Sequence, residues 1–225
     1  MKTVYAAVLG IAALLLSACV TGDEITSYVI DPDGSIEFST YRNNLTSSEA
    51  GEDAKTDLAN YIRSMEEKSD DLFTKLVEAN AQEVHVIVLR RASPASVLIT
   101  GRIPSLNDLA VYMTEKADAE NRVVCIAISK ERVQGIRCEL THNSSNEELP
   151  AATVMPEETK PDAIASNVDP INVTRFVLAK GEFIKAQGFL LAPNKRAAVF
   201  DEDTLSKTQT SPITVSLEWQ SSEAP

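Results

Sequence analysis

The sequence has few of the residues that commonly serve in catalysis and metal binding. Its 225 residues include two histidines, His85 and His142, and three cysteines. The histidines have no zinc-ligand spacing to each other or to the cysteines. Phosphate-binding glycine loops, Gly-x-Ser-x-Gly elbows and His-Glu-x-x-His motifs are also absent from the sequence. The sequence therefore indicates no catalytic residue, no cofactor and no metal site.

Basic residues are scarce as well. Lysine and arginine total 21 against 33 aspartates and glutamates, which gives a formal net charge of −12. An acidic surface repels nucleic acid and anionic lipid headgroups, so we expect no nucleic-acid partner. Beyond the first residues, no apolar run approaches the roughly 20 residues that a membrane-spanning helix needs.

The N-terminal segment has the features of an export signal. Lys2 supplies a positive charge, and an apolar run from Val4 to Leu16 follows. This run is too short to span a bilayer and is followed by the small residues Ser17 and Ala18, as in a secretory signal peptide. The next residues, Leu16-Ser17-Ala18-Cys19, resemble the lipobox of bacterial lipoproteins.

This resemblance implies cleavage after Ala18, so that residues 1–18 are a signal peptide and Cys19 carries the lipid. The membrane would then be a partner through the acyl chains on Cys19, because two or more chains anchor a domain stably. Val20 is not the aspartate that retains many lipoproteins in the inner membrane, which favours the outer membrane, facing the periplasm. The alternatives are an ordinary secretory signal with an incidental Cys19, or a short uncleaved anchor.

The other two cysteines lie in β-like runs, residues 122–129 and 134–141. A hairpin around Glu131 and Arg132 would place Cys125 opposite Cys138, close enough for a disulfide bond. An oxidising periplasm would close that bond. The alternative is a pair of buried free thiols, which behave as small apolar residues.

The pattern of residues 19–142 predicts an α+β domain. Residues 25–30 and 35–41 form a hairpin around Asp31-Pro32-Asp33-Gly34, which would pair Ile30 with Ile36 and Tyr28 with Phe38. Two or three helices and two further strand pairs follow. We expect Ser47 or Ser48 to cap the first helix, Glu66-Glu67 and Asp70-Asp71 to form a solvated helix edge, and Pro104 and Ser105 to open the third. Strands at 84–89 and 96–100 should be central strands of a largely antiparallel sheet with the helices on one face.

The composition changes after residue 142. Residues 143–170 contain four prolines, six acidic residues and no aromatic residue, which predicts a linker or long loop. Residues 171–220 return to strand-like runs, at 173–178, 189–191, 197–200 and 213–219, and predict a small β-rich C-terminal unit. This unit is marginal for folding alone, so it should pack on the first domain or supply strands to its sheet. Residues 221–225 form a polar tail.

One further resemblance covers about residues 50–130. The succession of helix, strand, strand ending Thr100-Gly101-Arg102, helix and strand looks somewhat like BON-type envelope domains. Those domains are associated with phospholipid contact and envelope integrity.

Three functions are compatible with these observations. The first is a non-enzymatic, lipid-anchored structural or interaction module with an envelope protein as partner. The second is a periplasmic hydrolase whose groups assemble only in the fold, with His142 as the base. The third is a binder of small ligands, with a pocket between the sheet and the C-terminal unit.

Overall fold

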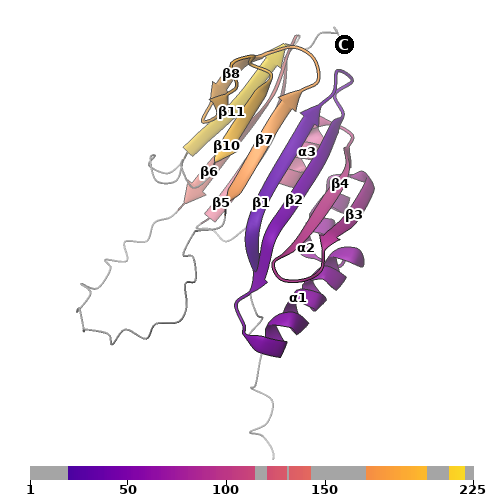
Figure 1. The fold of residues 1–225 in the computed structure, drawn as a ribbon. Coiled ribbons are helices and arrows are strands. Elements are labelled where there is room, and N and C mark those ends of the chain that lie inside the picture. Colours follow the sequence, from indigo (N-terminus) through magenta and orange to yellow (C-terminus); the bar gives the residue numbers. More distant parts are fainter. Residues whose placement is uncertain (1–19, 115–120, 131, 143–170, 202–212, 221–225) are drawn as a thin grey trace, which may run out of the picture.

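The computed structural model describes residues 20–114, 121–130, 132–142, 171–201 and 213–220. The predicted signal peptide, Cys19, the linker and the tail all lie outside the described residues. The described chain is a mixed α+β fold built on two sheets (Figure 1).

The first hairpin forms as predicted. Strand β1 (Val20–Ile30) pairs with β2 (Ile36–Ser47), and the register joins Ile30 to Ile36 and Tyr28 to Phe38. All four side chains are buried. In the turn, Gly34 adopts a positive φ of 85° and its amide donates to the Asp31 carbonyl at 3.0 Å. A glycine suits this position because it accepts the left-handed backbone without a steric penalty.

The first sheet has seven strands in the described part of the chain. Their order is β3 (Gln82–Arg90), β4 (Ala95–Ile103), β2, β1, β7 (Asn172–Leu178), β10 (Ala197–Asp201) and β9 (Leu190–Leu191). The prediction of a central strand at 84–89 is wrong, because β3 is an edge strand of this sheet. Apolar side chains lie on both faces of β3, as they would on a central strand. On one of these faces, however, Ile87 and Leu89 are 48% and 55% exposed.

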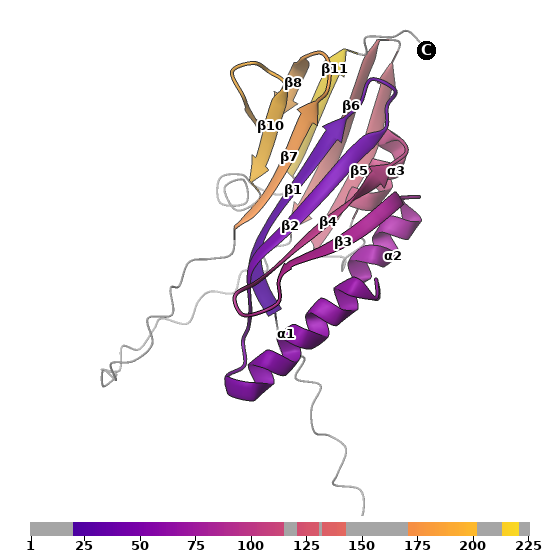
Figure 2. The same cartoon turned by 45° about the vertical axis from the view of Figure 1, so that its right-hand side comes forward.

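The prediction of one sheet is also wrong. The cysteine hairpin, β5 (Asn121–Lys130) and β6 (Val133–His142), belongs to a second, antiparallel sheet of four strands. Its remaining strands are β11 (Ile213–Gln220), which pairs with β6, and β8 (Phe183–Gln187). Figure 2 shows this sheet behind β1 and β7, with the helices beside it.

Helices α1 (Gly51–Glu66) and α2 (Asp71–Glu78) are separate, and Lys68 between them has a positive φ of 55°. Neither predicted serine caps α1. Its N-cap is Ala50, because Ser47 still belongs to β2 and its hydroxyl donates to Asp57. The α1 face that packs on the first sheet consists of Leu58, Ile62 and Met65.

The acidic pairs at the helix ends make specific contacts instead of forming only a solvated edge. Glu66 forms an ion pair with Arg91 at 2.5 Å. Asp70 caps α2 by accepting from the Leu72 amide at 3.0 Å. The third helix, α3 (Leu106–Met113), begins as predicted after Ser105, whose hydroxyl accepts from the Asp108 amide.

The segment 171–220 supplies strands to both sheets and forms no sheet of its own among the described residues. Strand β7 lies parallel to β1, with Tyr28 beside Phe176, and β10 extends the same sheet. Strands β8 and β11 complete the second sheet. The sequence predicted all of these strands except β8, in which polar and apolar residues are mixed.

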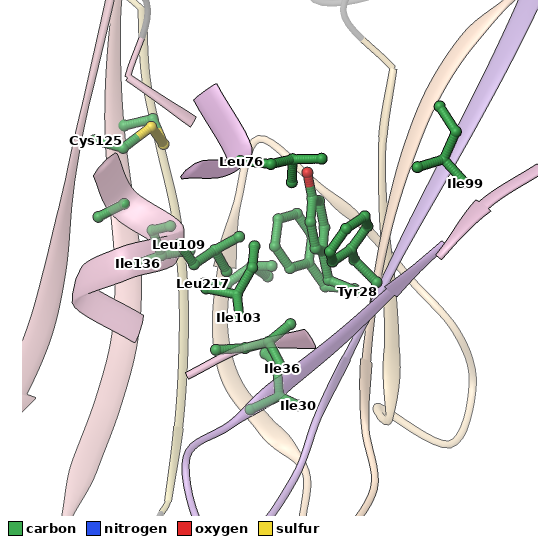
Figure 3. Close-up of a cluster of buried hydrophobic side chains, with 14 of the residues drawn as sticks. Tyr28, Ile30, Ile36, Leu76, Ile99, Ile103, Leu109, Cys125, Ile136 and Leu217 are labelled. Atoms are coloured by element: carbon green, nitrogen blue, oxygen red, sulfur yellow. A yellow bond between two sulfur atoms is a disulfide. The ribbon is translucent and has the colours of Figure 1, made fainter. Parts of the chain in front are cut away.

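One core unites the two sheets. Figure 3 shows Ile30, Ile36 and Tyr28 of the first sheet in one cluster with Ile136 and Leu217 of the second sheet and Leu109 of α3. The predicted pairing of Cys125 with Cys138 is present as a disulfide, with an S–S distance of 2.04 Å. Both cysteines are buried at the edge of this core.

Candidate binding cavity

A cavity of about 480 Å³ lies between the two sheets. Strands β1, β7 and β10 form one wall, and β5, β6 and β11 form the other. Helices α2 and α3 close one side. Its volume falls within the roughly 300–1,000 Å³ of small-molecule sites. Aliphatic and aromatic side chains form most of its surface, namely Tyr28, Leu72, Tyr112, Met113, Val123, Ile136, Leu140, Val173, Phe176, Phe189, Phe200 and Val215.

The inner end of the cavity is aromatic. The Tyr28 and Phe176 rings stack with centroids 5.2 Å apart, and both residues are buried. Phe189 lies edge-on to Phe176 at 5.7 Å and tilted against Phe200 at 5.4 Å. Such rings present a large apolar surface in fixed geometry, which suits the apolar part of a ligand.

The inner end is also uncharged. Burial raises the pKa of the Tyr28 hydroxyl well above its usual value of 10, and the neighbouring Tyr112 and Glu24 add to the shift. Tyr28 therefore stays protonated throughout the physiological pH range. The Tyr28 hydroxyl has a side-chain hydrogen bond with Tyr112, so it introduces neither a charge nor an unpaired polar group into the apolar part of the site.

The outer end of the cavity is polar. It contains Glu24, Thr26, Asp71, Lys75, Asn172 and Thr174. The Glu24 carboxylate accepts from Arg42 Nε at 2.7 Å, so its charge is already paired. Thr26 shares a hydrogen bond of 3.0 Å with Thr40 of β2. This end can contact the polar part of a ligand while the aromatic end holds the apolar part.

The change from polar to aromatic follows the same sequence pattern in both parallel strands. In β1 the residues that line the cavity are Glu24, Thr26 and Tyr28, and in β7 the alternate residues Asn172, Thr174 and Phe176 line it together with Val173. The register pairs these residues one for one, so both strands place equivalent groups at equal depth. The polarity gradient is therefore a property of two aligned strands and not of one side chain.

A second hollow of about 350 Å³ adjoins this cavity and shares Glu24 and Asn172 with it. Arg42 lies here, and its Nη1 donates to the Tyr61 hydroxyl at 2.7 Å. The hollow extends along β1 to Val20 and Thr21. It thus continues from the polar end of the cavity to the first described residue of the chain.

The histidines considered as catalytic groups do not assemble a site in the described structure. His85 is exposed on the edge strand β3 and pairs with Thr100. The backbone of His142 ends β6 opposite Asn121, and its side chain lies outside the described part. No histidine or serine occurs among the described residues that line the cavity. The hydrolase interpretation thus gains no support from the geometry.

The described residues contain neither a metal-binding cluster nor a membrane-spanning helix. They contain no group of three histidine, cysteine, aspartate or glutamate residues arranged to hold a metal ion. None of their helices combines the length and apolar character needed to cross a membrane.

The sequence did not identify the cavity residues individually. The available signal was the repeated order of side chains on one face of each strand, Glu-x-Thr-x-Tyr at 24–28 and Asn-x-Thr-x-Phe at 172–176. A buried strand face that begins polar and becomes aromatic indicates a partly solvated end. This signal becomes informative only once the two strands are known to be neighbours.

No protein family matches the sequence, and no curated protein is detectably similar to it. Among solved structures, the fold matches the NMR structure of the folded domain of LppM from Mycobacterium tuberculosis. The TM-score is 0.47 at 9% sequence identity, over 95% of this chain and 97% of that one. A likeness at this level carries no argument about function.

Proposed function

We propose that this protein is a lipid-anchored, non-enzymatic protein of the cell envelope that binds an amphipathic small molecule in the cavity between its sheets. The observation that carries the proposal is the polarity gradient of the cavity. An aromatic, uncharged inner end formed by Tyr28 and Phe176 is continuous with a polar outer end at Glu24 and Asn172. Pockets of this size whose apolar lining is combined with polar groups at one end are typical ligand sites.

The location in the envelope rests on different evidence. The segment Leu16-Ser17-Ala18-Cys19 resembles a lipobox, and Val20 favours the outer membrane, facing the periplasm. The Cys125–Cys138 disulfide agrees with an oxidising compartment. Mass spectrometry of the mature protein should find three acyl chains on an N-terminal Cys19, and an unmodified N-terminus elsewhere would contradict this part of the proposal.

Filling the cavity tests the binding proposal. Leu140 is half-buried in the cavity wall, so Leu140→Trp places an indole ring in the space available to a ligand. Titration calorimetry with N-phenyl-1-naphthylamine, an uncharged apolar probe, should show about tenfold weaker binding, a loss of about 1.4 kcal/mol. The matched control is Ile126→Trp on the neighbouring strand. Ile126 is 52% exposed and does not line the cavity, so this variant should bind the probe as the unaltered protein does.

Two outcomes would overturn the binding proposal. One is a folded protein that does not bind the probe, and the other is equal affinity in both variants. In either case the alternative is a structural or interaction module. The acidic surface and the lack of catalytic motifs are compatible with that function as well.

A further inference from the structure

We propose that the mouth of the cavity faces the membrane that anchors the protein, and that its occupant is an acyl chain of an uncharged or zwitterionic lipid drawn from that bilayer. This inference rests on the proposed function, because it requires both the lipid on Cys19 and a cavity that binds amphiphiles. It adds the direction of entry and the class of ligand.

The connection between the lipid-bearing Cys19 and the first sheet is short. Strand β1 begins at Val20, the residue that directly follows Cys19. Adjacent Cα atoms across a trans peptide bond are about 3.8 Å apart. No spacer therefore separates the lipid-bearing residue from the sheet, and the start of β1 must lie at the bilayer surface.

The polar end of the cavity lies near the start of β1. Glu24 at the polar end is four residues from Val20, about 13 Å at about 3.3 Å per residue. Tyr28 at the aromatic end lies four residues further along the strand. Because β7 runs parallel to β1, Asn172 also opens its strand at the polar end. The mouth is thus the end of the cavity nearest the anchor.

The second hollow lies between the start of β1 and the mouth of the cavity. The second hollow is lined by Val20 and Thr21 at one end and by Glu24 and Asn172 at the other. The last two residues also line the main cavity. A depression therefore leads from the residue beside the lipid to the polar end of the cavity, and a chain entering from the bilayer would follow it.

The end of the molecule that carries the mouth of the cavity is acidic. The start of α1 lies at the same end of the molecule as the start of β1 (Figures 1 and 2). Acidic side chains outnumber basic ones there: Asp23, Glu49 and Asp53 belong to this end, whereas Glu24 and Glu52 form ion pairs with Arg42 and Lys55. Carboxylates repel anionic headgroups at close range, which favours uncharged or zwitterionic lipids at this surface. The threonine and asparagine side chains of the rim can bond a polar headgroup, and the aromatic end accepts the chain.

Depth-dependent quenching of tryptophan fluorescence tests the orientation. Trp219 is the only tryptophan and is replaced by phenylalanine. A single tryptophan is then introduced at Ile171, which precedes β7 at the mouth, or at Glu182, which follows the distant end of β7. Both positions are exposed. The full lipidated proteins are anchored in phosphatidylcholine vesicles that contain nitroxide-labelled phosphatidylcholine.

We expect Ile171→Trp to lose a larger fraction of its fluorescence than Glu182→Trp. Without lipid, the same variants carrying Cys19→Ala should lose little fluorescence at either position. Equal quenching at the two positions, or stronger quenching at Glu182→Trp, would overturn the orientation. Binding of N-phenyl-1-naphthylamine by the unlipidated protein in solution would still support the proposed function in that case.

A third tryptophan tests the occupant. Phe189 lines the cavity and is half-buried, so Phe189→Trp reports on a labelled chain inside it. We expect its quenching to exceed that of Glu182→Trp. At a fixed fraction of labelled phosphatidylcholine, replacing the unlabelled phosphatidylcholine by phosphatidylglycerol should strengthen this quenching, because an anionic lipid competes less with the labelled chain for the cavity. Quenching at Ile171→Trp without quenching at Phe189→Trp would overturn the proposed occupant. So would a lipidated protein that excludes N-phenyl-1-naphthylamine in a detergent in which the Cys19→Ala protein binds it, because the protein's own acyl chain would then fill the cavity.

Discussion

Gly101 lies opposite Phe38 in the pairing of β2 with β4. A Cβ atom at Gly101 would stand 2.6 Å from a carbon of the Phe38 ring. This glycine therefore allows a buried aromatic ring to lie against the sheet backbone. The same glycine carries the resemblance of residues 50–130 to BON-type domains. Its packing against Phe38 explains why a glycine stands at this position, and no contact with phospholipid is needed for that explanation.

Replacing Gly101 by alanine should destabilise the protein by about 1–3 kcal/mol, the usual cost of overpacking a core. Chemical denaturation of the full chain measures the change. Combining Gly101→Ala with Phe38→Leu should cost less than the sum of the two single changes, because the smaller side chain leaves room for the methyl group. Unchanged stability of Gly101→Ala would show that the ring moves freely.

The hairpin of β5 and β6 is cross-linked by a disulfide, and its buried side chains belong to the core that both sheets share. Strands β5 and β6 pair from Asn121–His142 to Lys130–Val133, and the disulfide joins their middle. The Thr114 hydroxyl accepts from the Cys125 amide at 3.0 Å, which ties the hairpin to the end of α3. Cys138 also forms part of the cavity wall.

Removing the cross-link through Cys125→Ala and Cys138→Ala should lower the free energy of unfolding by about 2–4 kcal/mol, mainly because the unfolded chain regains freedom. Urea unfolding with and without reductant measures this loss. Reductant should destabilise the unaltered protein by a similar amount and leave the double variant unchanged. A double variant as stable as the oxidised protein would show that the hairpin does not depend on its disulfide.

At the scale of the whole molecule, the chain on either side of residues 143–170 contributes to both sheets. Strand β1 pairs with β7, and β6 pairs with β11. Buried residues such as Phe176 and Leu217 come from the C-terminal part, and Tyr28 and Ile136 come from the N-terminal part. Neither part has a complete core of its own in the described structure.

Cutting the chain at a protease site inserted after Ala152 should therefore leave the two fragments associated. They should elute together from a sizing column in native buffer and separate only in denaturant. The fragment ending at His142, produced alone, should not fold, because it lacks the strands that cover Tyr28 and Ile136. A cooperatively folding N-terminal fragment would contradict this account and support two independent domains.

The sequence by itself determined the local features of this protein. Alternation of side chains and the turn residues specified the β1–β2 register, and the same reasoning specified the pairing of Cys125 with Cys138. Pro104 and Ser105 located the start of α3. Partners in these features are close in sequence, so turn geometry and spacing alone determine which residues meet. The lipid anchor on Cys19 remains a prediction from sequence.

Only the tertiary structure decided which distant strands are neighbours. An alternating strand shows which face is buried but does not identify the strand at its edge. For this reason the edge position of β3, the division into two sheets and the parallel pairing of β1 with β7 could not be predicted from sequence. The cavity depends on that last pairing, because its polarity gradient exists only where Glu24, Thr26 and Tyr28 lie beside Asn172, Thr174 and Phe176.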